Sequence, residues 1–199
     1  MALTKLNYTG QGTIPIAKIP TITGAKMPAS SIIKVQTNPI TAFGTTNLTT
    51  SFIDIAGTEQ SFTRTVSNSK ILVTFNLKLT SLQGLTLRLN RKIGSGSYAV
   101  VNNGASGTNS GRTSELGVFG CYYNTITINA MGYGIHSDIY NFLDESGEGL
   151  SNTTDAITYK LTCKGATANS KVFLNITGYD GTGGNFTTES SVTFTEIKV

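Results

Sequence analysis

Apolar and polar residues alternate along several short stretches of this chain. The clearest stretch is residues 71–79, where apolar residues at the odd positions alternate with Thr74, Asn76 and Lys78. A period of two is typical of a β-strand that has one face in a core and the other in water. Residues 85–89 resume the alternation after a short turn, so we expect the two segments to pair as an antiparallel hairpin.

The same pattern continues through the rest of the chain after residue 45. Residues 157–163 and 172–176 alternate in the same way, which predicts a core position for Cys163. Eight or more short strands with Gly-rich turns predict an all-β fold, namely an antiparallel β-sandwich with a jelly-roll-like body. Further strands are expected over residues 50–56, 60–66, 97–101, 116–130 and 190–198.

The first 44 residues differ from this pattern and are expected to form an extended arm, which leaves residues 45–199 as the body. All four prolines, Pro15, Pro20, Pro28 and Pro39, lie in this stretch. Proline fixes φ, removes a hydrogen-bond donor and favours extended geometry at the preceding residue. The sequence therefore predicts an extended or polyproline-like strap and no helix.

The formal net charge of +4 also belongs to this arm. Its four lysines precede the first acidic residue, Asp54, and the remaining 11 basic and 11 acidic residues balance. A floppy leader is one interpretation, but regularly spaced isoleucines favour a tether that lies along a partner and meets acidic residues there. Four charges over 34 residues are too sparse for a nucleic-acid arm, so we expect no nucleic-acid partner. The predicted anchoring residues are Ile14, Ile16, Lys18, Ile19, Ile22, Lys26 and Met27.

Charged residues make up only 13% of the chain, about half of the usual ~25%. The outer strand faces therefore carry Thr and Asn, and such faces lose little when a neighbouring subunit covers them. Phe62, Phe173 and Ile197 fall on faces that look polar by alternation, so we expect them to be exposed toward a partner. We do not expect the monomer to be the working unit.

Catalytic and metal-binding signals are weak. His136 is the single histidine and lies in a stretch that looks like a strand start. The sequence contains no GxSxG motif that would supply the nucleophilic serine of a Ser-His-Asp site. The cluster LDESGEG, with Asp144, Glu145 and Glu148, lacks EF-hand spacing and is expected to be solvated. The loop Gly94–Gly111 lacks the Lys-Ser/Thr ending of a phosphate-binding loop. We expect no enzyme activity, cofactor or metal.

Two cysteines, Cys121 and Cys163, have no metal-ligand spacing. The N-terminus lacks the apolar segment of a signal peptide, so we expect synthesis in a reducing cytoplasm and free thiols. No apolar run approaches the roughly 20 residues that a membrane span requires, so no membrane partner is expected.

Six blocks, in this order along the chain, resemble one group of proteins. They are GQGTIPIAKIPTITGAKMPAS, SNSKILVTFNLKL, LRLNRKIGSGSY, YNFLDES, AITYKLTCKG and SSVTFTEIKV. Together they resemble the short fibre-like or decoration proteins of tailed bacteriophages, notably phages of marine bacteria. In related proteins the LDES segment often continues with Pro and Thr, whereas here GEGLSN follows, so that loop is expected to differ in shape.

The resemblance implies a virion structural protein on the particle surface, made in the host cytoplasm, with a jelly-roll-like body that forms a homotrimer. A capsid decoration (cement) or head-fibre protein, anchored by its arm to the major capsid protein or another virion protein, fits the absence of a repeat-built shaft. The alternative is a tail fibre or receptor-binding protein that recognises host-surface glycan. The residues expected to do so are Tyr98, Asn102, Asn103, Tyr122 and Tyr123.

Overall fold

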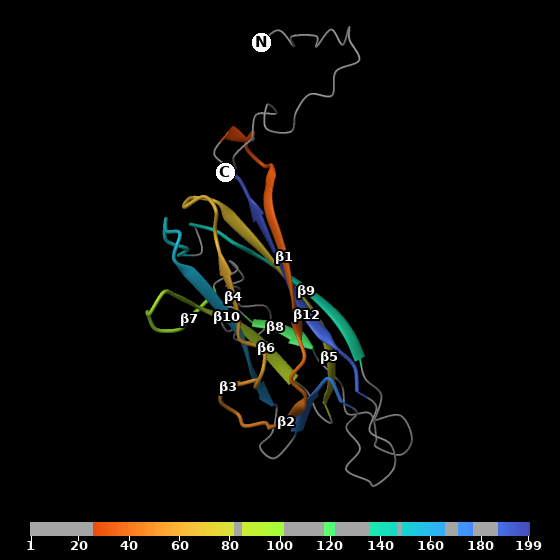
Figure 1. Cartoon of the computed structure of the whole chain (residues 1–199). Helices are drawn as coiled ribbons and strands as arrows, with labels where there is room; N and C mark the ends of the chain where they lie inside the picture. Colours follow the sequence, from red (N-terminus) through yellow and green to blue (C-terminus); the bar gives the residue numbers. More distant parts are fainter. Residues whose placement is uncertain are drawn as a thin grey trace, which may run out of the picture.

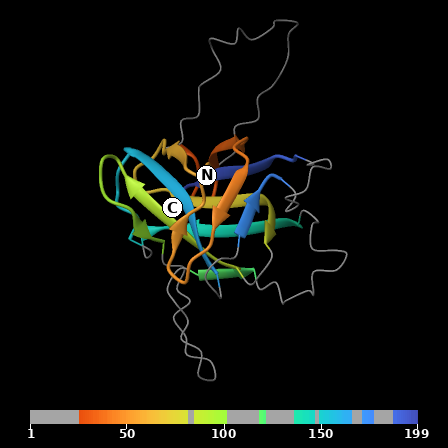
Figure 2. The same ribbon diagram turned by 90° about the horizontal axis from the view of Figure 1, so that it is seen from below.

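Two antiparallel β-sheets pack face to face in the computed structural model of this chain (Figures 1 and 2). No α-helix occurs in the part of the chain that the structure describes. That part comprises residues 26–81, 85–101, 118–121, 136–146, 149–165, 171–176 and 187–199.

The first sheet is built around the long strand β5. β9 pairs with one edge of β5, while β12 and β11 pair with successive parts of its other edge. β1 lies beyond β12, and β2 lies beyond β11. The strands of this sheet are β1 (Ile32–Ile40), β2 (Gly44–Asn47), β5 (Lys70–Ser81), β9 (His136–Asp144), β11 (Lys171–Leu174) and β12 (Ser190–Ile197).

The second sheet is built around β10. β6 pairs along one edge of β10, and the short strands β3 and β4 share its other edge. β7 and β8 both pair with the far edge of β6. The strands of this sheet are β3 (Ile53–Asp54), β4 (Gln60–Thr63), β6 (Leu85–Ile93), β7 (Ala99–Val100), β8 (Val118–Cys121) and β10 (Ala156–Gly165).

The order of these strands is that of a jelly roll. The first sheet reads β1-β12-β5-β9, and the second reads β4-β10-β6-β8, with β3 and β7 extending its edges. The chain changes sheet between most successive strands, as two interlocked Greek keys require. The prediction of an all-β, jelly-roll-like body is therefore confirmed.

The predicted hairpin between residues 71–79 and 85–89 is wrong. These segments are strands β5 and β6, but they lie in different sheets and pair with different partners. Alternation fixes which face of a strand meets the core, whereas it does not fix which strand lies beside it. Both strands direct their apolar faces into the same layer between the sheets.

That layer is the hydrophobic core. Val73 and Phe75 of β5 and Leu87 and Leu89 of β6 are fully buried, as is Cys163, whose predicted core position is confirmed. Burying one such large side chain contributes about 1.5–3 kcal/mol. Phe194 of β12 packs on two rings of the facing sheet, those of Phe62 at 5.3 Å and Tyr159 at 5.5 Å between ring centroids.

Residues 32–40, expected in the arm, belong to the body as β1. The inward side chains of β1 hydrogen-bond to β4 across the open side of the sandwich. Lys34 Nζ donates to the Thr63 carbonyl at 2.9 Å, and Asn38 Nδ2 donates to Gln60 Oε1 at 3.2 Å. Pro39 is tolerated because β1 pairs only with β12 among the described strands, and an edge strand can lack one donor. The boundary between arm and body lies near residue 31, not 44.

Several other predicted strands are shorter in the structure. The segment 50–56 contributes only β3, the segment 60–66 only β4, and the segment 97–101 only β7. The segment 116–130 contains β8, and its other residues lie outside the described ranges. Residues 190–198 form β12 almost as predicted.

Gly57 is a site where the turn before β4 depends on glycine. Its φ is +83°, and a Cβ added there would lie 2.2 Å from Ala42 Cβ. We expect Gly57→Ala to lower the free energy of unfolding by about 2 kcal/mol or more, because strain in the left-handed region adds to a steric clash. Urea denaturation measures the change. Gly44→Ala, where the added Cβ meets nothing within 4 Å, is the control and should be nearly neutral; equal losses would contradict the argument.

Candidate functional site

The outer face of the first sheet carries no charged side chain over three successive rows of residues. Strand register places one residue each from β1, β12, β5 and β9 in every row. We call these residues the neutral face. They are Val35, Thr195, Leu72 and Leu143; Thr37, Thr193, Thr74 and Asn141; and Pro39, Ser191, Asn76 and Ile139.

Polar groups on the neutral face bond to one another. The hydroxyls of Thr37 and Thr193 are 2.9 Å apart, and Thr74 Oγ1 donates to Asn141 Oδ1 at 2.7 Å. These two pairs already have protein partners, so covering them with another surface leaves them satisfied, whereas Asn76 Oδ1 on the same face is buried without a partner. Ile139 and Leu143 add exposed apolar area on the same face. The face can therefore be buried at low desolvation cost.

Charged residues border the neutral face at its two ends. Lys70 forms an ion pair with Glu145 at 2.5 Å beside the row that contains Leu72. At the opposite end, Lys78 Nζ donates to the hydroxyl of Ser137. An arrangement of this kind, with an uncharged centre and a polar margin, is typical of a protein interface.

The outer face of the second sheet is different, because it carries cations packed on aromatic rings. Arg88 Cζ lies 3.6 Å from the ring centroid of Phe52, and Lys164 Nζ lies 5.1 Å from the same ring. Lys160 Nζ lies 4.0 Å from the ring of Tyr98. The prediction of uncharged outer faces therefore holds for the first sheet only. The charged-residue content of the whole chain does not show on which face the charges lie. We call Arg88, Lys92, Lys160 and Lys164 the cationic face.

Tyr98 is the member of the predicted glycan-recognition set that the structure describes. It is half-buried beside Lys92 and Lys160, which also pair with Glu59 at 3.3 Å and Asp54 at 2.7 Å. Burial, together with the neighbouring Glu59 carboxylate, raises the pKa of the Tyr98 hydroxyl. The other members, Asn102, Asn103, Tyr122 and Tyr123, lie outside the described residues.

The root of the arm is fixed against the C-terminal residues. Lys198 accepts a hydrogen bond from Ser30 N–H at 2.8 Å, donates its own N–H to the Ser31 carbonyl at 2.9 Å, and donates Nζ to the Met27 carbonyl at 2.5 Å. Of the predicted anchoring residues, Lys26 is exposed and Met27 is half-buried at this root. Ile14, Ile16, Lys18, Ile19 and Ile22 lie outside the described residues.

Two aromatic residues expected on partner-facing surfaces are buried instead. Phe62 lies in the core against Phe194, and Phe173 is buried in β11, which has β2 on one edge and β5 on the other. The prediction for Phe62 failed because Gln60 and Arg64 share its inward face, which therefore looks polar in the sequence. Ile197 is half-buried on the outer side of β12.

Asp144 is not solvated as predicted, because it is fully buried between the two sheets. Its carboxylate accepts hydrogen bonds from Arg91 of β6 and, at 2.8 Å, from the Tyr159 hydroxyl of β10. Burial raises the pKa of Tyr159, and the nearby Asp144 adds to this effect. The ion pair links β9 in the first sheet to β6 in the second. The cluster LDESGEG thus begins with a structural residue and not with a metal ligand.

Glu196 is a second buried carboxylate at the same end of the sandwich. It accepts hydrogen bonds from the backbone of Thr65 and Val66 at 2.8 Å each and from the Ser69 hydroxyl at 2.7 Å. Burial alone would raise the pKa of Glu196, but these hydrogen bonds together lower it below the ordinary value. Glu196 therefore ties the loop between β4 and β5 to β12. Alternation gives no signal for either acid, since both occupy inward positions that usually hold apolar residues.

Reactive chemistry is sparse in the described ranges. The Cys163 thiol is free, and burial raises its pKa to about 12, which keeps it protonated and unreactive. His136 begins β9, as its sequence context indicates. No three His, Cys, Asp or Glu side chains among the described residues come together as a metal site would require. Nor does this part of the chain contain a helix long and apolar enough to cross a membrane.

Comparisons with known proteins give a match at the level of structure only. The sequence matches no protein-family model and no curated protein. Similar solved structures include the T13 particle of infectious bursal disease virus, at 11% identity and a TM-score of 0.39 over 83% of this chain and 35% of that chain. Another is the VP2 subviral particle of the same virus, at 12% identity and a TM-score of 0.40 over 91% of this chain and 43% of that chain. This chain thus spans less than half the length of these matched chains.

Removing one partner of the buried ion pair tests its structural role. We expect Arg91→Leu to lower the free energy of unfolding by about 3–5 kcal/mol, because it leaves the Asp144 carboxylate buried and uncompensated. The double variant Arg91→Leu with Asp144→Leu should lose much less, since no buried charge then remains. Guanidinium denaturation at pH 7 measures both variants, and a stable single variant would refute the assignment.

Glu196 predicts a specific dependence of stability on pH. Its folded-state pKa is below the ordinary value of 4.5, so on acidification the unfolded chain takes up this proton first. The stabilisation is therefore present above about pH 4.5 and is lost as the pH falls through the folded-state pKa. We expect the free energies of unfolding of the wild type and Glu196→Gln to converge as the pH is lowered from 7 to 3. A difference that stays constant over this range would exclude this role.

Proposed function

We propose that this chain is a bacteriophage virion structural protein that acts on the particle surface as a homotrimer. Within that class we propose a capsid decoration (cement) or head-fibre protein, anchored by its N-terminal arm to the major capsid protein or another virion protein. The neutral face is the observation on which this proposal chiefly depends. The jelly-roll topology and the sequence blocks that resemble phage decoration proteins also support it.

The neutral face favours contact with further copies of the same chain. A surface without charge does not repel its own copy, and it leaves no ion unpaired when two copies meet. Most soluble monomers cover such a sheet with Lys and Glu, whereas here these positions hold Thr, Ser, Asn and aliphatic residues. The face is thus suited to self-association.

The size of the neutral face limits the strength of a single contact. Four strands about 4.8 Å apart and three rows about 6.8 Å apart give a flat area of roughly 400 Å². A stable interface usually buries about 800 Å² of accessible surface on each partner. We therefore infer that body contacts alone are weak, and that three arms on one trimer strengthen attachment through their effective concentration.

The proposed role is architectural and needs no catalysis. The arm root and the C-terminus lie together at one end of the body (Figure 1). In a trimer of parallel bodies, three arm roots would face the same side and reach one surface together. The opposite end of each body would then point away from the particle.

A second candidate function is recognition of host-surface glycan by a tail fibre or receptor-binding protein. Its support is the cationic face, where the half-buried rings of Phe52 and Tyr98 lie beside lysine and arginine side chains. Aromatic rings and hydrogen-bonding side chains suit sugar rings. A glycan array with the full chain tests this function, and an array without any bound glycan would reject it.

Self-association is tested by placing a charge on the neutral face. We expect Thr193→Lys to weaken trimer formation by about 100-fold or more, because an unpaired buried ion costs several kcal/mol. Thr63→Lys, an exposed threonine on the second sheet, is the control and should leave the trimer intact. Sedimentation equilibrium over a range of protein concentrations measures both variants. A wild type that stays monomeric up to millimolar concentration, or equal weakening in both variants, would overturn the proposed trimer.

A further inference from the structure

Six apolar side chains gather where the neutral face meets the arm root. Register places Ile32 beside Ile197, and the next row crosses the sheet from Val35 through Thr195 and Leu72 to Leu143, with Thr195 as its one polar member. Contiguous exposed apolar groups of this kind usually mark an interaction site. The exposed fractions are 57% for Ile32, 57% for Val35, 42% for Leu143 and 55% for Val199. We call Ile32, Val35, Leu72, Leu143, Ile197 and Val199 the apolar end.

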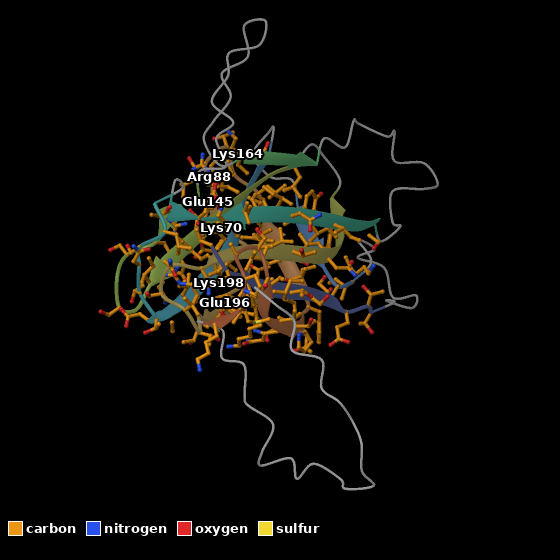
Figure 3. All side chains as sticks on the ribbon, turned by 90° about the horizontal axis from the view of Figure 1, so that it is seen from above. Lys70, Arg88, Glu145, Lys164, Glu196 and Lys198 are labelled. Carbon is orange, nitrogen blue, oxygen red and sulfur yellow. The ribbon has the colours of Figure 1, made fainter. Side chains whose placement is uncertain are left out.

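Polar groups define the limits of the apolar end. The Lys70–Glu145 ion pair adjoins Ile197 and Leu72 in the strand register, and Lys198, which holds the arm root, lies between Ile197 and Val199 along the chain. Figure 3 labels these three charged residues. The uncharged Thr37–Thr193 pair follows in the next row along the strands. A ligand for this area therefore has to be apolar and short, and it needs no charge of its own.

The arm of this protein contains a segment with that character. Ile16, Ile19 and Ile22 recur every third residue, and Pro15 and Pro20 favour polyproline geometry. Polyproline II has three residues per turn and rises about 3.1 Å per residue, which would align the three isoleucines along one side over about 19 Å. The apolar end extends about 14 Å across four strands, from Val35 to Leu143. The two lengths are comparable.

We infer that the apolar end of one body binds the segment Ile14–Ile22 from the arm of a second copy. This inference rests on the self-association part of the proposed function, and it names the residues that would connect the copies. It moves Ile14–Ile22 from the capsid contact to a neighbouring body, which leaves the part of the arm before Ile14 to anchor the particle. Twenty-five residues precede Lys26, where the described chain begins, and fully extended they reach about 80 Å. That reach is ample for a neighbouring body.

The length of the connection favours a neighbour's arm over the chain's own. Only three residues separate Ile22 from Lys26 at the arm root, which itself lies beside the apolar end. Lys198 alternates with Ile197 and Val199, so the Met27 carbonyl that its side chain holds lies on the other side of the strand from the apolar end, and the chain's own arm would have to pass around the sheet edge to cover this area. A neighbour that packs on the neutral face approaches the apolar end from its open side, so exchanged arms would connect the bodies into one assembly.

Disulfide trapping between two differently tagged chains tests the inference. Both chains are full length and carry Cys121→Ser, so that the introduced thiols are the reactive ones; Cys163 is buried. One chain carries Ile19→Cys and the other carries Leu143→Cys. After mixing and mild oxidation we expect a disulfide-linked heterodimer on non-reducing gels. Its yield should exceed, by about 10-fold, that from the control pair in which Thr63→Cys replaces Leu143→Cys.

Sedimentation of the same unoxidised mixture separates the two proposals. If the mixture sediments as a trimer and also yields the disulfide-linked heterodimer on the gel, the inference is supported. If it sediments as a trimer but yields no such heterodimer, the inference is overturned and the proposed self-association stands. A monomer overturns both proposals. A single chain with both Ile19→Cys and Leu143→Cys is the remaining comparison. If it forms only an internal disulfide while the mixed chains form none, the arm covers its own body and the inference is wrong.

Discussion

The ion pair between Arg91 and Asp144 is the constraint on which this end of the sandwich depends. It joins β6 of one sheet to β9 of the other inside a layer that is mostly apolar, and the Tyr159 hydroxyl also donates to the carboxylate. A buried ion pair contributes less to stability than its strength suggests, because both ions lose their hydration. Its geometry, however, is specific. It fixes the position of β9, and β9 supplies the outermost column of the neutral face.

Glu196 extends this polar cluster toward the chain ends. It holds the loop between β4 and β5 against β12, one residue before Ile197 and two before Lys198. Lys198 in turn holds Met27, Ser30 and Ser31. The arm root is therefore connected to the folded core through a short series of hydrogen bonds. A cationic leader attached in this way leaves the body from a defined position.

The sequence predicts the strands of this fold well and their neighbours poorly. Alternation locates β5, β6, β10 and β12, because a strand with one buried face repeats every two residues wherever it lies. The pattern contains no information on pairing. The short turn between the two segments therefore led to the wrong prediction of a hairpin between β5 and β6. The jelly-roll prediction succeeds because many short strands without helices leave few other architectures.

The candidate surfaces are predicted only in part, for a related reason. A low charge content predicts uncharged outer faces, but the lysines and arginines gather on the second sheet and leave the first without any over three rows. Inward polar residues cause the remaining errors. Arg64 makes the buried face of β4 look solvent-exposed, and Asp144 looks like part of a solvated turn until β6 supplies its partner. Such pairs join residues far apart in the chain, so local patterns do not reveal them.

The hydrogen bonds between Lys198 and residues 27–31 bring both ends of the folded chain to one pole of the molecule (Figure 1). Any peptide fused after Val199 therefore emerges beside residues 27–31. An inserted sequence is better placed at the opposite pole, where strands turn far from both ends.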